Sequence, residues 1–195
     1  MTLDQVIARI RRVLMLEPAA YEEVRDDTQF TLVSLGSAGV AVLLAAIGAW
    51  LFGETVLDPA PGLGFADTVI FGTIFTIVLF LIGVAVIYLM LSQVFGEETT
   101  PDALVRVVTL THLPYGLGLF VFVPQIGFAF GLASIAATFY YTIFGIRAAY
   151  PNLDNRRAMI AVLAGFAVWA ILIPIISDYP DNNWVTGVFV YSLID

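Results

Sequence analysis

The chain has 195 residues, of which 60% are hydrophobic, and its mean hydropathy of +0.94 leaves too little polar surface for a water-soluble protein. Its net charge of −8 disfavours binding to nucleic acid, and because it is acid-rich and has no lysine, we hypothesise a halophilic source. Because it has no cysteine, disulfides, thiolate catalysis and iron–sulfur ligation are excluded.

Length and composition together predict an all-α integral membrane protein, a five-helix transmembrane bundle with an N-terminal amphipathic interfacial helix. About 20 mostly apolar residues cross the hydrocarbon core, so this chain has room for five spans with short connections. We expect a cytoplasmic N-terminal segment at 1–29, a membrane domain at 30–176 and an extracytoplasmic tail at 177–195. The apolar runs predict spans at about 30–52, 67–95, 103–123, 126–146 and 159–176.

The first predicted element is an amphipathic helix at residues 3–16. Its apolar residues recur at helical spacing, whereas Arg9 and Arg12 lie on the other side. Such a helix suits the cytoplasmic membrane interface, with its apolar face at the acyl boundary and Arg9 and Arg12 on lipid headgroup phosphates. The alternative is that the same face packs against the bundle, and both hypotheses stay open at this point.

Three predicted spans carry small residues about one helical turn apart, a spacing that lets neighbouring helices approach closely. We interpret these faces mainly as packing surfaces within the molecule, with a seam between two copies of the chain as the alternative. The helix-packing residues are Ser37, Ala41, Ala45 and Ala49 in the first span, Gly127 and Gly131 in the fourth, and Ala161 and Gly165 in the fifth.

The third span is the least lipid-like of the five. Ionisable groups inside a membrane often mark a proton relay or a solute path, so a proton-linked role for His112 is one hypothesis. The alternative is a neutral imidazole that bridges two helices and bonds a carbonyl left free by Pro114. Arg106 either snorkels to the interface or pairs with Asp102. The candidate intramembrane polar site comprises Arg106, Thr111, His112, Pro114 and Tyr115.

No motif in the sequence indicates catalysis. There is no phosphate-binding glycine loop, no HExxH motif and no GxSxG motif. One histidine without cysteine does not build a zinc site unless several carboxylates join it, and clustered loop acids such as Glu97, Glu98 and Asp102 are usually just solvated. We therefore expect no enzyme, no catalytic residue, no metal site and no cofactor.

The arginines predict the topology. All eight basic residues are arginines, and in the five-span arrangement they fall on one side of the membrane: four before the first span, one at the start of the third and three between the fourth and fifth. Since juxtamembrane basic residues are retained in the cytoplasm, we expect the N-terminus inside and the C-terminus outside. The N-terminal residues do not predict a signal peptide, because charges interrupt their apolar run.

Three stretches resemble the Yip domain, the five-span family of Ypt/Rab-interacting proteins and their prokaryotic relatives. Residues 96–118 (GEETTPDALVRVVTLTHLPYGLG) are similar to the family's glycine turn, polar cap and proline-broken span. Residues 139–165 (FYYTIFGIRAAYPNLDNRRAMIAVLAG) resemble its Gly-Ile-Arg turn and last span, and 12–18 (RVLMLEP) its lead-in. The resemblance implies five helices and a cytoplasmic N-terminus. We expect the protein to lie in the plasma membrane of a prokaryote. A GTPase partner does not carry over, because the long hydrophilic N-terminal region of many eukaryotic members is lacking.

These observations predict a non-enzymatic membrane scaffold or adaptor, because packing faces are abundant and reactive groups are scarce. The expected partners are membrane lipids and either another membrane protein or a second copy of the chain, with no nucleic acid. The alternative is a small transporter or channel that uses the broken third span and His112. The two hypotheses differ in whether a polar path crosses the bundle.

Overall fold

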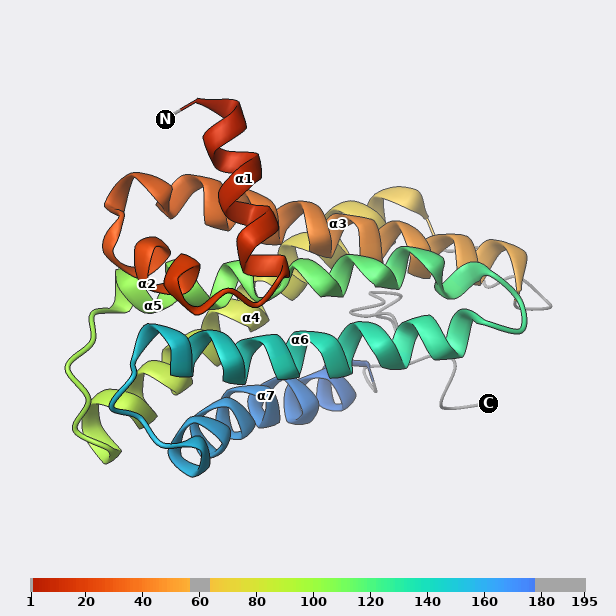
Figure 1. The fold of residues 1–195 in the computed structure, drawn as a ribbon. Helices are drawn as coiled ribbons and strands as arrows, with labels where there is room; N and C mark the ends of the chain where they lie inside the picture. Colours follow the sequence, from red (N-terminus) through yellow and green to blue (C-terminus); the bar gives the residue numbers. More distant parts are fainter. Residues whose placement is uncertain (1, 57–63, 178–195) are drawn as a thin grey trace.

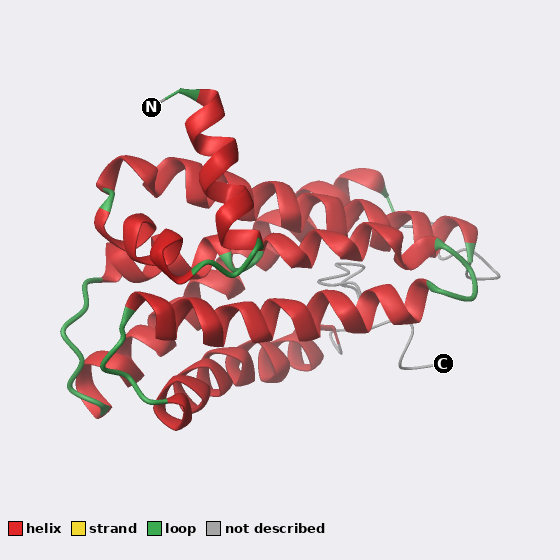
Figure 2. Cartoon of the chain, viewed as in Figure 1, coloured by secondary structure: helices red, strands yellow, loops and turns green. Residues whose placement is uncertain are grey.

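The computed structural model describes residues 2–56 and 64–177, and all the regular elements within these ranges are helical (Figure 1, Figure 2). Five helical segments in these ranges are long and apolar enough to cross a membrane, which confirms the predicted all-α fold with five spans. Most of the predicted external tail lies outside the described residues. The spans cover Thr28–Thr55, Ala66–Val94, Pro101–Phe122, Gly127–Ala149 and Asn155–Leu172.

Two short helices precede the bundle, α1 (Leu3–Leu14) and α2 (Pro18–Asp26). The first span joins the 3-10 turn η1 (Thr28–Phe30) to α3 (Thr31–Thr55). The remaining four spans consist of η2 (Ala66–Phe71), α4 (Gly72–Leu89) and η3 (Met90–Val94); α5 (Pro101–Leu110) and η4 (Leu113–Phe122); α6 (Gly127–Ala149); and α7 (Asn155–Ser177).

Local sequence explains where two of the helices begin. At α1, the Thr2 hydroxyl accepts from the Gln5 amide and the Gln5 side chain accepts from the Thr2 amide, which is a capping box. At α5, the Thr100 hydroxyl accepts from the Ala103 amide, and Pro101 takes the first turn, where its missing N–H costs nothing. The helix start predicted around Thr100 and Pro101 is therefore confirmed.

The second span is the longest and is irregular at both ends. Its 29 residues extend about 43 Å at about 1.5 Å per residue, against a hydrocarbon core of about 30 Å. The two end segments, η2 and η3, are π-helical, whereas α4 between them is a regular α-helix. The irregular turns of this span therefore lie towards its two ends, and its middle is unbroken.

The third span breaks where its proline predicts. Helix α5 ends at Leu110, and the chain continues as the 3-10 helix η4, in which Pro114 occupies the first turn. A tight turn then leads to α6. Gln125 adopts a left-handed backbone there with φ of 71°, and a Cβ on Gly127 would collide with the Val121 carbonyl oxygen. Only glycine at position 127 therefore allows this turn to close.

The predicted small-residue face of the first span packs inside the bundle. Ala41, Ala45 and Ala49 are buried, and Ser37 is half-buried. A Cβ on the neighbouring Gly48 would meet the backbone of η4, with the Leu119 Cα only 2.7 Å away. Small side chains on α3 therefore let its backbone lie directly against the backbone of η4.

Helix α6 buries a face made of glycine, alanine and hydroxyl residues. Each of its three buried hydroxyls donates to a carbonyl of the same helix, over 2.7 to 2.9 Å. Every buried hydroxyl on this face therefore has a hydrogen-bond acceptor. Helices α4 and α7 cross at a similar contact, where a Cβ on Gly83 would lie 3.1 Å from the Gly165 carbonyl oxygen, and Ala161 is also buried. The buried residues of α6 are Gly127, Gly131, Ser134, Thr138, Thr142, Gly145 and Ala149, together with the larger Ile146.

Candidate functional site

The arginines gather at one end of the bundle, which we call the arginine end. Helices α3, α5 and α7 begin there, the α6 helix ends there, and the α1–α2 pair packs beside them (Figure 1). The described contacts link these segments directly, since Arg25 donates to the Ala149 carbonyl and the Arg157 guanidinium lies over the Phe95 ring. The segments that carry the arginines therefore lie at one end of the bundle.

Helix α2 is set into the bundle between α5 and α6. Tyr21 and Val24 are fully buried, and the Tyr21 ring meets the edge of the Phe144 ring with 5.6 Å between centroids. The Tyr21 hydroxyl donates to the Val13 carbonyl over 3.0 Å, which ties the end of α1 to α2. A Cβ on Gly145 would lie only 2.8 Å from the Tyr21 ring, so that glycine makes the space for it. The α1–α2 hairpin is therefore part of the packed structure at the arginine end.

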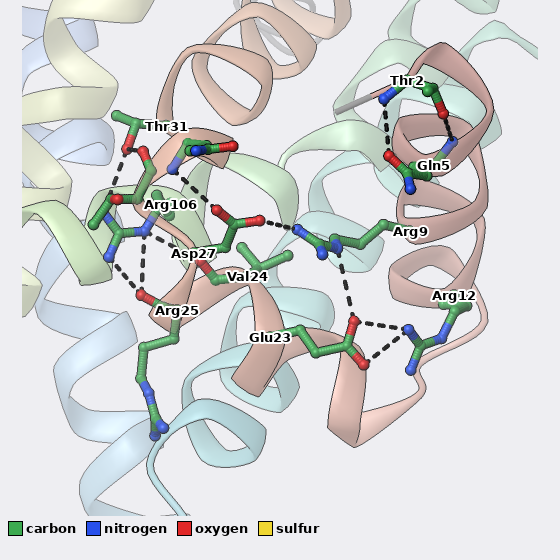
Figure 3. Close-up of polar contacts among 12 residues, drawn as sticks. Thr2, Gln5, Arg9, Arg12, Glu23, Val24, Arg25, Asp27, Thr31 and Arg106 are labelled. Atoms are coloured by element: carbon green, nitrogen blue, oxygen red, sulfur yellow. Dashed lines mark hydrogen bonds and ion pairs between the residues drawn. The ribbon is translucent and has the colours of Figure 1, made fainter.

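Arg106 holds the C-terminal end of α2 from inside the bundle. Its side chain is 4% exposed, its Nε donates to the Val24 carbonyl over 3.1 Å, and its guanidinium also donates to the Arg25 carbonyl and the Thr31 hydroxyl (Figure 3). These carbonyls lie in the last turn of α2, where helix partners are missing and the helix dipole favours a cation. Both expectations for Arg106, snorkelling and pairing with Asp102, are therefore wrong.

Arg9 and Arg12 bind protein carboxylates in the structure. Arg12 contacts Glu17 and Glu23 over 2.8 to 2.9 Å, and Arg9 contacts Asp27 over 2.6 Å and Glu23 over 3.7 Å (Figure 3). Helix α2 thus supplies carboxylate partners that the pattern of α1 alone does not reveal, and the expected contact of Arg9 and Arg12 with lipid headgroups stays a prediction. These ion pairs hold α1 to α2 on the exposed side of the hairpin.

This network makes the hairpin sensitive to acid. The hydrogen bond from Arg9 holds the pKa of Asp27 below its ordinary value. A carboxyl group with a lowered native pKa stabilises the fold above its unfolded pKa of about 3.9 and loses that contribution as pH falls through the native value. We expect the melting temperature of wild type to exceed that of Asp27→Asn at pH 6 in detergent, and the gap to close at more acidic pH. A gap independent of pH would contradict this role of Asp27.

An open polar groove of about 630 Å³ lies next to Arg106 at the arginine end. Its walls are held by internal contacts: Arg25 pairs with Asp26 over 2.7 Å, and the Tyr150 hydroxyl bonds the Thr99 hydroxyl. The hydrogen bond from Arg25 lowers the pKa of Asp26, and burial raises the pKa of Tyr150, so the groove carries a fixed carboxylate and a neutral phenol at neutral pH. The groove is lined by Arg25, Asp26, Glu98, Thr99, Thr100, Ala103, Arg106 and Tyr150.

His112 lies at the break of the third span, away from this groove. Its Nδ1 is 3.0 Å from the Val108 carbonyl of its own helix, and its ring lies 3.9 Å from the Phe80 ring, centroid to centroid. A small pocket of about 50 Å³, also lined by Tyr115, adjoins the ring. His112 therefore contacts α4 through its ring, and the hydrogen bond between helices is made instead by Thr111, whose hydroxyl lies 2.9 Å from the Thr142 hydroxyl of α6. The structure thus brings Thr111, His112 and Tyr115 near one another but sets Arg106 at the arginine end.

The family comparison covers most of the chain. A family model described as "Yip1 domain" matches residues 12–177, which include α2 and all five spans. The chain belongs to the Yip1 domain family. No curated protein and no solved structure matches it. The match begins inside α1, so most of the first helix of this Yip1-domain protein precedes the matched region.

In this Yip1-domain protein the residues that build the groove come from segments far apart in the sequence. Helix α2, the segment 98–100, α5 and Tyr150 each contribute to its wall. The sequence predicts Glu98 as a loop residue and Thr100 as a helix cap. No sequence pattern predicts that either residue lies beside Arg25. Within residues 2–56 and 64–177, no cluster of three or more histidine or acidic residues is placed to hold a metal ion.

Proposed function

We propose that this Yip1-domain protein is a non-enzymatic membrane adaptor that binds a polar segment of another membrane protein in the groove at the arginine end. The observation that carries the proposal is the groove itself: an open space of about 630 Å³ whose polar walls are held in place by contacts within the protein. Side chains that are already ordered lose little conformational entropy when a partner binds. The groove therefore suits recognition.

The charges of the groove favour a segment that carries both signs. Arg25 and Arg106 supply positive charge to the lining of the groove, and Asp26 and Glu98 supply negative charge. Arg106 and Asp26 are engaged within the protein, whereas the exposed Glu98 carboxylate has no partner among the described residues. A basic side chain of the partner would find its counter-charge at Glu98. Charge complementarity of this kind gives specificity and speeds association.

The sidedness of the groove follows from the positive-inside rule. We propose that the arginine end faces the cytoplasm, because basic residues next to spans are retained there. The partner segment is then a cytoplasmic loop or tail of a protein in the same membrane. We expect this membrane to be the plasma membrane of a prokaryote. A second copy of this chain is an alternative occupant that the same experiment identifies.

The adaptor proposal predicts that reversing the charge of Glu98 removes the partner. From crosslinked native membranes, we expect Glu98→Arg to recover about tenfold less partner than wild type, or about 1.4 kcal/mol, because a like charge would face the partner's basic group. Affinity purification with mass spectrometry measures this. Glu97→Arg is the matched control, since Glu97 is an adjacent acid that does not line the groove. If wild type and both variants recover equal amounts of partner, the partner does not bind in the groove.

Transport is the second candidate, and the pocket beside His112 is the observation that favours it. A transporter requires solute or proton flux across liposomes that contain the purified protein, and flux that His112→Gln abolishes would overturn the adaptor proposal. The adaptor proposal predicts no flux above that of empty liposomes. It also predicts that His112→Gln leaves partner recovery unchanged, because His112 does not line the groove.

A further inference from the structure

Helix α1 leaves the bundle sideways, across its long axis (Figure 1). Val13 is its only fully buried residue, and Val6 and Ile10 on the same side pack partly against the bundle core. Its outward side is apolar, because Leu3, Ile7 and Leu14 are 73%, 55% and 40% exposed. Their spacing of four and seven residues places these three side chains on one stripe. An exposed apolar stripe of this kind requires a surface to cover it.

The attachment of α1 sets its depth along the bundle. The Leu14 carbonyl accepts a hydrogen bond from the Tyr141 hydroxyl over 2.7 Å. Tyr141 lies eight residues before Ala149, the last residue of α6, which is about 12 Å from that end of the helix. The first two spans, of 28 and 29 residues, exceed the hydrocarbon core of about 30 Å by about 12 to 14 Å.

The excess length of the bundle belongs at the arginine end. At the opposite end, the third and fourth spans are joined by a tight turn, with the apolar residues Ile126 and Phe128 exposed beside it. Buried arginine and the polar groove occupy the arginine end instead. If the first two spans project about 12 Å beyond the hydrocarbon there, the end of α1, which lies beside them, is near the boundary between acyl chains and headgroups.

The arginine that faces this boundary is Arg11. Its side chain is exposed and has no hydrogen bond or ion pair among the described residues. It comes four residues after Ile7 and three before Leu14, at the edge of the stripe. Arg9 and Arg12 are engaged with the carboxylates of α2. In a lipid monolayer the phosphates lie next to the acyl chains. An unpaired guanidinium beside an apolar stripe can therefore contact a phosphate while the stripe contacts the acyl chains.

We propose that α1 lies on the bilayer surface at the arginine end, with Leu3, Ile7 and Leu14 among the acyl chains and Arg11 on a lipid phosphate. The ion pairs of Arg9 and Arg12 hold the helix at this level. This role does not rest on the proposed function of the groove, and it belongs to a segment that mostly precedes the Yip1 domain match. The helix thereby supports the hairpin that forms one wall of the groove.

The chain has no cysteine, so a single introduced cysteine carries a fluorophore at one known position. We expect a label at Ile7→Cys, in the full-length protein in vesicles of zwitterionic and anionic phospholipid, to be quenched severalfold more by acyl-chain nitroxides than a label at Ala8→Cys. The water-soluble quencher iodide is expected to give the opposite order, since Ala8 is exposed away from the stripe. Strong iodide quenching and weak lipid quenching at both positions would overturn the proposal.

The role of Arg11 has its own test in the same vesicles. We expect Arg11→Gln to weaken lipid quenching of the position-7 label when anionic lipid is present. Arg147→Gln is the control for total charge, because Arg147 is also exposed and lies at the end of α6. Dissolved inorganic phosphate is not expected to compete. Equal effects of the two variants would overturn the assignment of Arg11, and competition by phosphate would assign it to a soluble anion instead of lipid.

Discussion

Replacing Arg106 by methionine is expected to destabilise the protein by about 3 kcal/mol, because it leaves two carbonyls in the last turn of α2 without their donor. Methionine fills a similar space, so the loss reports hydrogen bonding more than packing. Thermal unfolding of the detergent-solubilised protein measures the total effect. Hydrogen–deuterium exchange localises it, and we expect the largest increase in the backbone amides of residues 19–26 in α2.

The control for Arg106 is a lysine at the same position. Arg106→Lys keeps the positive charge near the end of the α2 dipole but does not reproduce the fork of donors, so we expect a loss between those of wild type and methionine. If Arg106→Met leaves both the melting temperature and the exchange of α2 unchanged, Arg106 does not hold the hairpin. The groove would then lack a fixed wall.

Replacing Gly48 by leucine is expected to cost about 3 kcal/mol or more, because the new side chain meets backbone. A Cβ there would collide with the Gly118 carbonyl oxygen and approach the Leu119 Cα to 2.7 Å. Backbone of a 3-10 segment already constrained by Pro114 has little freedom to move aside. Helix α3 and η4 would have to separate, and we expect a lower melting temperature together with aggregation in size-exclusion chromatography.

Gly36 is the matched control on the same helix. Nothing lies within 4 Å of a Cβ built at Gly36, so Gly36→Leu adds the same side chain in open space. We expect its stability to stay within about 0.5 kcal/mol of wild type or to rise, because leucine favours a helix more than glycine does. If Gly36→Leu is as harmful as Gly48→Leu, the packing of α3 described here is wrong.

Much of the fold is readable from local features of the sequence. The five spans follow from long apolar runs, the start of α5 from Thr100 and Pro101, and the break of the third span from Pro114. Each of these signals acts within one or two helical turns, on the backbone of the residue that carries it. The all-helical fold with five spans was therefore predictable from the sequence.

The site was less predictable, because its contacts join residues far apart in the chain. Arg106 donates to carbonyls 81 and 82 positions away. Every residue has a backbone carbonyl, so the sequence does not identify which one accepts from an arginine. The carboxylates that bind Arg9 and Arg12 are closer, but they become partners only when α1 and α2 fold back on each other. Helical spacing alone assigned both arginines to lipid.

Site-specific photocrosslinking from position 98 in native membranes tests the proposed function most directly. With p-benzoylphenylalanine in place of Glu98, at the exposed edge of the groove, the adaptor account predicts one discrete crosslinked membrane protein. The same probe in place of Glu97 is expected to capture much less of it. No crosslinked protein at position 98, or the same set of products from both positions, would contradict a partner seated in the groove.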